Sequence, residues 1–171
     1  MNKYPLVFVA ALLGICLLTT PARAIDQAEY QKTLATAKAL LAEEKDEQAF
    51  NLYREKIRTQ PKEPLWHAQL GKTISLVAAM YYKGKPVQQK KYYDESEQHY
   101  LEAIKLYDPV KDKLMIAQCH YDIGTIYEFI RKDAEKAANL YLKALELDPQ
   151  HKYAIDGLKR IRQADIQMAS K

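Results

Sequence analysis

Histidine and cysteine are the side chains of this sequence best suited to chemistry, as metal ligands, bases or nucleophiles. The 171-residue chain has four histidines and two cysteines, and no two histidines stand at the spacing of a zinc-binding motif. Cys119 and His120 are adjacent, but neighbours on a helix point about 100° apart and cannot act as a nucleophile and its base. His67 and His120 each precede a glycine by four residues in a helical pattern, which favours packing between helices. We therefore expect no catalytic residue, no metal site and no cofactor, and a buried structural thiol at Cys119.

The composition argues against several other classes of site. The formal net charge is only +4, so no strongly basic face suited to nucleic acid is indicated. The chain has only five glycines, which disfavours an all-β fold and a phosphate-binding loop. Its carboxylates are scattered along charged helix faces, and no pair stands out as acid and base.

One segment gathers lysines and tyrosines. Four lysines are flanked on both sides by paired tyrosines: Lys83, Lys85, Lys90 and Lys91, with Tyr81, Tyr82, Tyr92 and Tyr93. In one interpretation this is a solvated hairpin end whose tyrosines pack back on their own helices. In the other it is a contact surface for an anionic partner, either an acidic protein face or lipid headgroups.

Three segments of the sequence superimpose on one another, and the helices that they predict would position the residues considered above. They are QAFNLYREKIRTQP, ESEQHYLEAIKLYDP and KAANLYLKALELDP, which end at Pro61, Pro109 and Pro149. Each has a small residue at its second position, tyrosine four residues later and an aliphatic residue after eight: Ala49, Tyr53, Ile57; Ser96, Tyr100, Ile104; Ala137, Tyr141, Leu145. Offsets of four and eight share one helical face, and proline then ends the helix.

A partner helix is predicted upstream of each segment. The second and third carry Leu70-Gly71 and Ile123-Gly124, and the first has Ala37 at the matching place. Together the two helices resemble the tetratricopeptide-repeat family. The resemblance implies an all-α fold of three antiparallel helix pairs, at about residues 26–61, 64–109 and 116–149, stacked in a right-handed superhelix with a concave groove. It implies protein binding and no catalysis.

The departures from the family pattern are also informative. The closing prolines are 48 and 40 residues apart, against a family repeat of about 34. The excess in the second motif predicts two lengthened helices joined around Lys83–Pro86, projecting past the stack. An amphipathic pattern over residues 151–168 predicts a helix that caps the last pair.

The resemblance also assigns the groove-facing positions. They are Leu34, Lys38 and Leu41 in the first motif, Ala68, Lys72 and Ser75 in the second, and Tyr121, Thr125, Glu128 and Phe129 in the third. Some members of the family clamp a terminal carboxylate with lysines and asparagines. Here Gln118 and Asp122 stand at two of the corresponding places, so no such clamp is expected.

The first 24 residues resemble an export signal. Lys3 is followed by an apolar run from Leu6 to Leu18, which at about 20 Å of helix is too short for a membrane core of about 30 Å. Ala22-Arg23-Ala24 fits a signal peptidase site and predicts a mature single domain of residues 25–171, soluble in the periplasm of a Gram-negative bacterium. A retained membrane anchor is the alternative for this segment.

Three functions are weighed against one another. The leading one is a periplasmic adaptor that binds a peptide or helix of a partner protein, for example in envelope, secretion or pilus assembly. The second is a structural subunit that self-associates through its repeats. An enzyme is disfavoured, because no motif with a catalytic mechanism is present.

Overall fold

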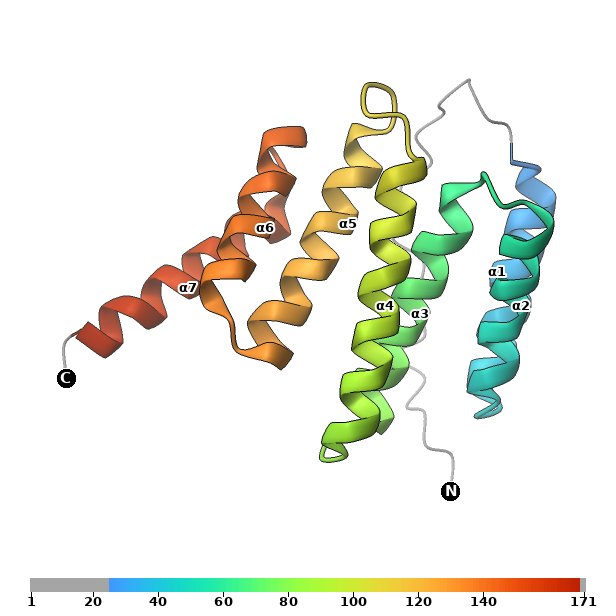
Figure 1. Cartoon of the computed structure of the whole chain (residues 1–171), viewed down its shortest axis with the longest axis horizontal. Helices are drawn as coiled ribbons and strands as arrows, with labels where there is room; N and C mark the ends of the chain where they lie inside the picture. Colours follow the sequence, from blue (N-terminus) through green and yellow to red (C-terminus); the bar gives the residue numbers. More distant parts are fainter. Residues whose placement is uncertain (1–24, 170–171) are drawn as a thin grey trace. The chain divides into compact units, whose positions relative to one another are not determined.

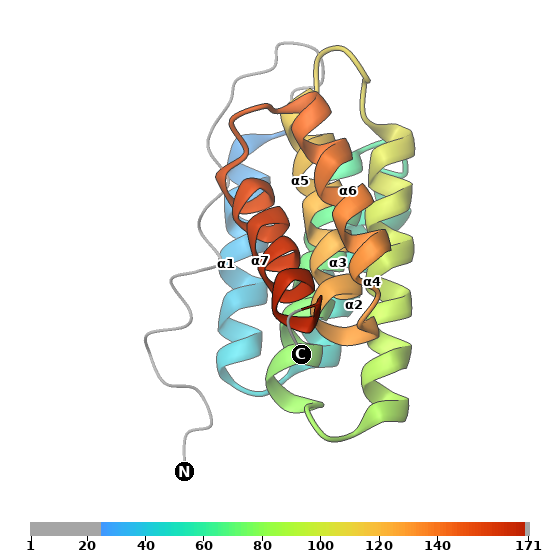
Figure 2. The ribbon, with the colours of Figure 1, turned by 90° about the vertical axis from the view of Figure 1, so that its left-hand side faces the viewer.

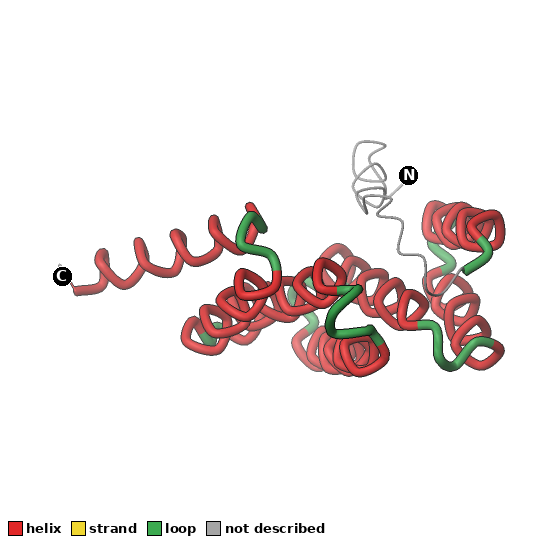
Figure 3. Tube along the Cα trace, turned by 90° about the horizontal axis from the view of Figure 1, so that it is seen from above, coloured by secondary structure: helices red, strands yellow, loops and turns green. Residues whose placement is uncertain are grey.

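The computed structural model describes residues 25–169, and this part of the chain is helical, with loops but no strand (Figure 3). The all-α prediction is therefore confirmed. The predicted signal segment, residues 1–24, lies outside the described residues. None of the described helices is long and apolar enough to cross a membrane.

The chain divides into two compact units, one ending at Glu63 and one beginning at Pro64. Each is treated by itself below. The superhelix and single domain predicted across both of them stay predictions.

The first unit contains the antiparallel pair α1 (Gln27–Ala42) and α2 (Asp46–Thr59). Asp26 caps α1, because its carboxylate accepts a hydrogen bond from the N–H of Ala28 at 2.9 Å. The small residues Ala37 and Ala49 are both fully buried, as the helix-pair pattern predicted. Glu29 of α1 accepts a 2.5 Å ion pair from Lys56 of α2, which ties the two helices together.

The second unit contains the remaining helices in chain order (Figure 1). They are α3 (Pro64–Tyr81), α4 (Pro86–Leu106), α5 (Lys113–Thr125), the π-helix η2 (Ile126–Arg131), α6 (Ala134–Leu147) and α7 (Lys152–Ala169). α3 packs on α4 and α5 packs on α6 as antiparallel pairs, and the prolines at 109 and 149 follow the ends of α4 and α6 as predicted.

The core of this unit is built from glycines set against tyrosines. A Cβ added at Gly71 would lie 3.3 Å from the Tyr100 ring, and one at Gly124 would lie 2.6 Å from the Tyr141 ring. Tyr100 and Tyr141 are almost completely buried. A side chain is therefore excluded at Gly124 by the Tyr141 ring, and at Gly71 by the Ser96 carbonyl oxygen, 3.0 Å from an added Cβ, together with the Tyr100 ring.

The predicted lengthening of the second motif is confirmed. α3 runs to Tyr81 and α4 starts at Pro86, so a four-residue link joins two long helices, and Gly84 in this link has a φ of 85° that suits glycine. The α3–α4 tip extends beyond the end of α5 and η2 (Figure 1).

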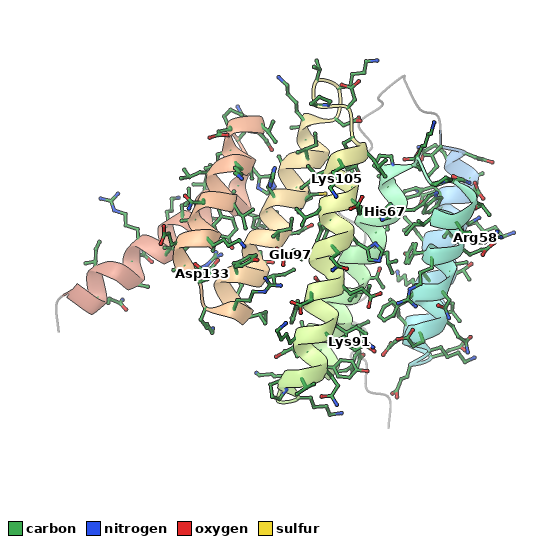
Figure 4. All side chains as sticks on the ribbon, in the orientation of Figure 1. Arg58, His67, Lys91, Glu97, Lys105 and Asp133 are labelled. Carbon is green, nitrogen blue, oxygen red and sulfur yellow. The ribbon has the colours of Figure 1, made fainter. Side chains whose placement is uncertain are left out.

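The third motif departs from the predicted α-helix. Its first helix changes from α to π at Ile126 and ends at Arg131, and the next residue, Lys132, has a left-handed φ of 57°. Arg131 holds this π turn to α4, because its guanidinium makes ion pairs of 2.8 Å with Asp94 and 2.6 Å with Glu97 (Figure 4 labels Glu97). Tyr127 adds a hydrogen bond of 2.9 Å to Glu97. π turns are rare in proteins, but those that do occur are often found at functional sites.

The predicted C-terminal helix is present as α7, which packs beside α6 (Figure 2). Its Gly157 lies against the Tyr141 ring, with an added Cβ only 2.5 Å from Cε2. Gly157 follows Gly124 by 33 residues, close to one family repeat. α7 is therefore built like the first helix of a further repeat.

Candidate functional site

The predicted groove positions of the second unit lie on α3, α5 and η2. Ala68 is only 8% exposed and belongs to the core, so it is a packing residue and not a contact residue. Lys72, Ser75, Tyr121, Thr125 and Glu128 are half-buried, and Phe129 is exposed. Lys72 makes no direct hydrogen bond or ion pair with another described residue. Its ammonium group is therefore available to a partner.

A chain of polar groups runs below this surface between α3 and α4. The Ser96 hydroxyl donates to the carbonyl of Gly71 at 2.8 Å and lies 2.5 Å from the hydroxyl of Ser75. Ser75 and Tyr100 also share a hydrogen bond. The predicted groove residue Ser75 is thus occupied by internal contacts.

Asp122 of α5 is the unusual charged group of this region. Its carboxylate accepts hydrogen bonds from the Gln118 amide, at 2.9 Å, and from the Tyr100 phenol. Loss of hydration raises the pKa of Asp122 to about 6, although the nearby Lys72 charge and these hydrogen bonds act in the opposite direction. The site therefore keeps a carboxylate whose pKa is raised to about 6 close enough to Lys72 to interact with it electrostatically.

The π turn gives Glu128 a different role from the predicted one. Arg160 of α7 donates two hydrogen bonds of 2.9 Å to the Glu128 carboxylate. The Tyr141 phenol donates a third hydrogen bond, of 2.5 Å, to the same carboxylate. Glu128 therefore fastens α7 to η2 instead of facing a ligand. Phe129 stays 49% exposed, with the Arg160 guanidinium 5.3 Å from its ring centre.

Aromatic side chains border this end of the surface. The Tyr121 ring lies 5.0 Å from His151 and 5.9 Å from Tyr153, which is 63% exposed. With Phe129, these rings offer apolar faces beside the polar pair of Lys72 and Asp122.

The groove positions predicted in the first motif lie in the other unit. Leu34 and Lys38 are half-buried on α1, but Leu41 is 8% exposed and belongs to the core. Leu41 is therefore a packing residue and not a contact residue, because the helix turns it toward the interior of its own pair.

The lysines and the tyrosines at the α3–α4 tip lie in different environments. Lys83, Lys85, Lys90 and Lys91 are all exposed (Figure 4 labels Lys91), and Lys90 makes a 2.5 Å ion pair with Asp94. Tyr82 and Tyr92 pack on each other within the tip, as the first interpretation predicted, whereas Tyr93 also packs against η2. The Tyr82 and Tyr92 rings lie 4.7 Å apart, and Tyr93 is 4% exposed in a cluster with Ala78 and Ile126. Tyr93 therefore cannot belong to a contact surface.

The predicted buried thiol is confirmed. Cys119 is 2% exposed, and burial, aided by the Asp122 charge, raises the pKa of its thiol well above the usual range. A thiol in this state is a poor nucleophile. Across residues 25–169, no group of three or more histidine, cysteine or acidic side chains is arranged to hold a metal ion.

Sequence reasoning missed three residues that shape this site. Asp122 was weighed only as a clamp position, Arg160 was not singled out, and Gly157 was not recognised as a repeat glycine. The 33-residue spacing from Gly124 to Gly157 carried the signal for the last of these.

Comparison with known proteins agrees with this architecture. A search of curated proteins found no similar sequence. A family model described as tetratricopeptide repeat matches residues 77–150, from the end of α3 to the link before α7. This match, with the helix pairs and their glycine–tyrosine contacts, supports a tetratricopeptide-repeat family assignment.

Proposed function

We propose that this protein is an exported adaptor that binds a segment of another protein on the surface formed by α3, α5 and η2. Tetratricopeptide repeats generally mediate protein–protein interaction and are typically non-catalytic. The proposal concerns which surface of this chain does so, and in which compartment.

The observation that carries the proposal is the pair of Lys72 and Asp122. A half-buried carboxylate whose pKa is raised costs folding free energy at neutral pH. Charged groups kept at such a cost gather at functional sites. Lys72 would attract an acidic group of the partner, and Asp122 would accept a hydrogen bond from its backbone or side chain.

A charge-reversal experiment tests this surface. Peptides selected from a random library against the folded protein should bind the Lys72→Glu variant roughly tenfold or more weakly, because a partly buried charge contact is reversed. Lys143→Glu is the matched control, since Lys143 is exposed on α6. Equal binding by wild type and Lys72→Glu, measured by fluorescence polarisation, would contradict the proposal.

Export rests on residues 1–24 and is a separate part of the proposal. The short apolar run and Ala22-Arg23-Ala24 support cleavage before Ile25 and a periplasmic location. The intact mass of protein recovered from the cells that make it should correspond to a chain starting at Ile25. A mass that includes residues 1–24 would overturn export with cleavage and leave the binding surface untouched.

A further inference from the structure

Two histidines that are 32 residues apart in the sequence meet between α3 and α4. The Nδ1 atoms of His67 and His99 lie 3.1 Å apart, and the ring centres are separated by 5.3 Å. Both residues are half-buried, so the pair is held in place by packing but is accessible from solvent (Figure 4 labels His67). Neither residue belongs to the proposed binding surface.

This spacing is that of two ligands on one metal ion. Two imidazole nitrogens at about 2.0–2.1 Å from a tetrahedral zinc ion lie about 3.3 Å apart. The observed separation differs from this by a few tenths of an ångström, which a small rotation of either ring supplies. Both rings must also turn on metal binding, because in the metal-free hydrogen bond the two Nδ1 atoms face each other and not a common position.

The charges around the pair favour a cation. Glu102 lies three residues after His99 on α4, and its carboxylate interacts electrostatically with both imidazoles. Lys105, also on α4, donates a 2.6 Å hydrogen bond to Glu102. Burial lowers the pKa of His67, so its ring is neutral and able to coordinate at neutral pH.

We propose that His67 and His99 form a binding site for a divalent transition metal ion of the zinc or copper type, completed by water. Without metal, one imidazole donates its Nδ1–H to the Nδ1 lone pair of the other. On binding, the donor ring moves its proton to Nε2, so that both Nδ1 atoms coordinate the ion and no proton is released overall. A metal held in this way would lock α3 to α4 and rigidify the helix that carries Lys72.

Titration with Zn²⁺ tests the site in the full mature chain. Zn²⁺ should raise the Tm of the wild type in a dose-dependent manner, because the folded state alone presents both ligands together. His67→Asn and His99→Asn should each weaken the apparent affinity roughly tenfold or more, the size of effect seen even for outer-sphere partners of a metal. His120→Asn is the matched control, because this half-buried histidine on α5 should leave the Zn²⁺ response unchanged.

Cu²⁺ provides a readout that does not depend on the stability of the variants. The electron paramagnetic resonance spectrum of the Cu²⁺-loaded wild type should show coupling to two nitrogen nuclei, and either substitution should remove one of them. A Zn²⁺ response that is absent in the wild type, or equal in the wild type and both variants, would overturn the proposal. The pair would then be a structural hydrogen bond only.

Discussion

Gly124→Leu is expected to lower the free energy of unfolding by more than about 3 kcal/mol, the upper end of typical overpacking costs. A Cβ at this position would lie 2.6 Å from Tyr141, and one at Gly157 would lie 2.5 Å from the same ring. The ring cannot move away from α5 without striking α7, and its phenol is fixed by the hydrogen bond to Glu128. Neither helix can therefore accept a side chain at its glycine.

Thermal melting measures this effect and its origin. The Tm should fall by about 10 °C or more, given a shift of about 4 °C per kcal/mol for a unit of roughly 100 residues. Ala79→Leu is the control, because it adds a similar volume at an exposed position of α3. Tyr141→Ala should partly rescue Gly124→Leu, so that the double variant loses less than the two single variants combined. If Gly124→Leu melts like the wild type, the assigned helix register is wrong.

Asp122→Asn is expected to stabilise the protein above pH 6 and to lose this effect on acidification. The folded pKa of Asp122, about 6, is above its usual 3.8, so the folded state binds more protons than the unfolded state between these values. The stability of the wild type therefore falls as pH rises from about 4 to 6, and the full cost is present at neutral pH. Two pKa units correspond to about 3 kcal/mol. Because the side chain is half-buried, a gain of about 1–2 kcal/mol is expected at pH 7.5.

Urea unfolding at pH 4 and pH 7.5 measures this difference. Asp156→Asn serves as the control, because Asp156 is a more exposed carboxylate on α7. A stabilised Asp122→Asn variant with weakened partner binding would show that the carboxylate serves binding at the cost of stability. A destabilising effect at pH 7.5, or a gain that is the same at both pH values, would contradict the account.

Much of the fold could be predicted from the sequence because it rests on local patterns. Gly71 and Gly124 each indicated a place where a tyrosine of the paired helix comes close to the backbone. The prolines at 61, 109 and 149 indicated where helices end. The length of the excess segment predicted the long α3–α4 pair. These signals depend on side-chain size and helical period, which a single sequence displays directly.

The site was less predictable because it depends on geometry between helices. The π turn at Ile126–Arg131 has no periodic signature in the sequence. It places Glu128 in contact with Arg160 and not at the predicted groove position. Leu41 and Tyr93 fell on the buried side because helix rotation decides which neighbouring position faces inward. His67 and His99 are remote in sequence, and only the packing of α3 on α4 brings their rings together.

The central claim is that a partner protein contacts the surface formed by α3, α5 and η2. Phe129 and Leu142 allow a matched test, because they are 49% and 48% exposed, on η2 and on α6 respectively. Each can be replaced by a photoactivatable phenylalanine analogue in the cells that make the protein, and crosslinked adducts can then be identified by mass spectrometry. We predict that the Phe129 position gives an adduct with a discrete partner, that this adduct is lost in the Lys72→Glu background, and that the Leu142 position gives none. An adduct formed from Leu142 but not from Phe129 would contradict the account and place the binding surface on the opposite helices.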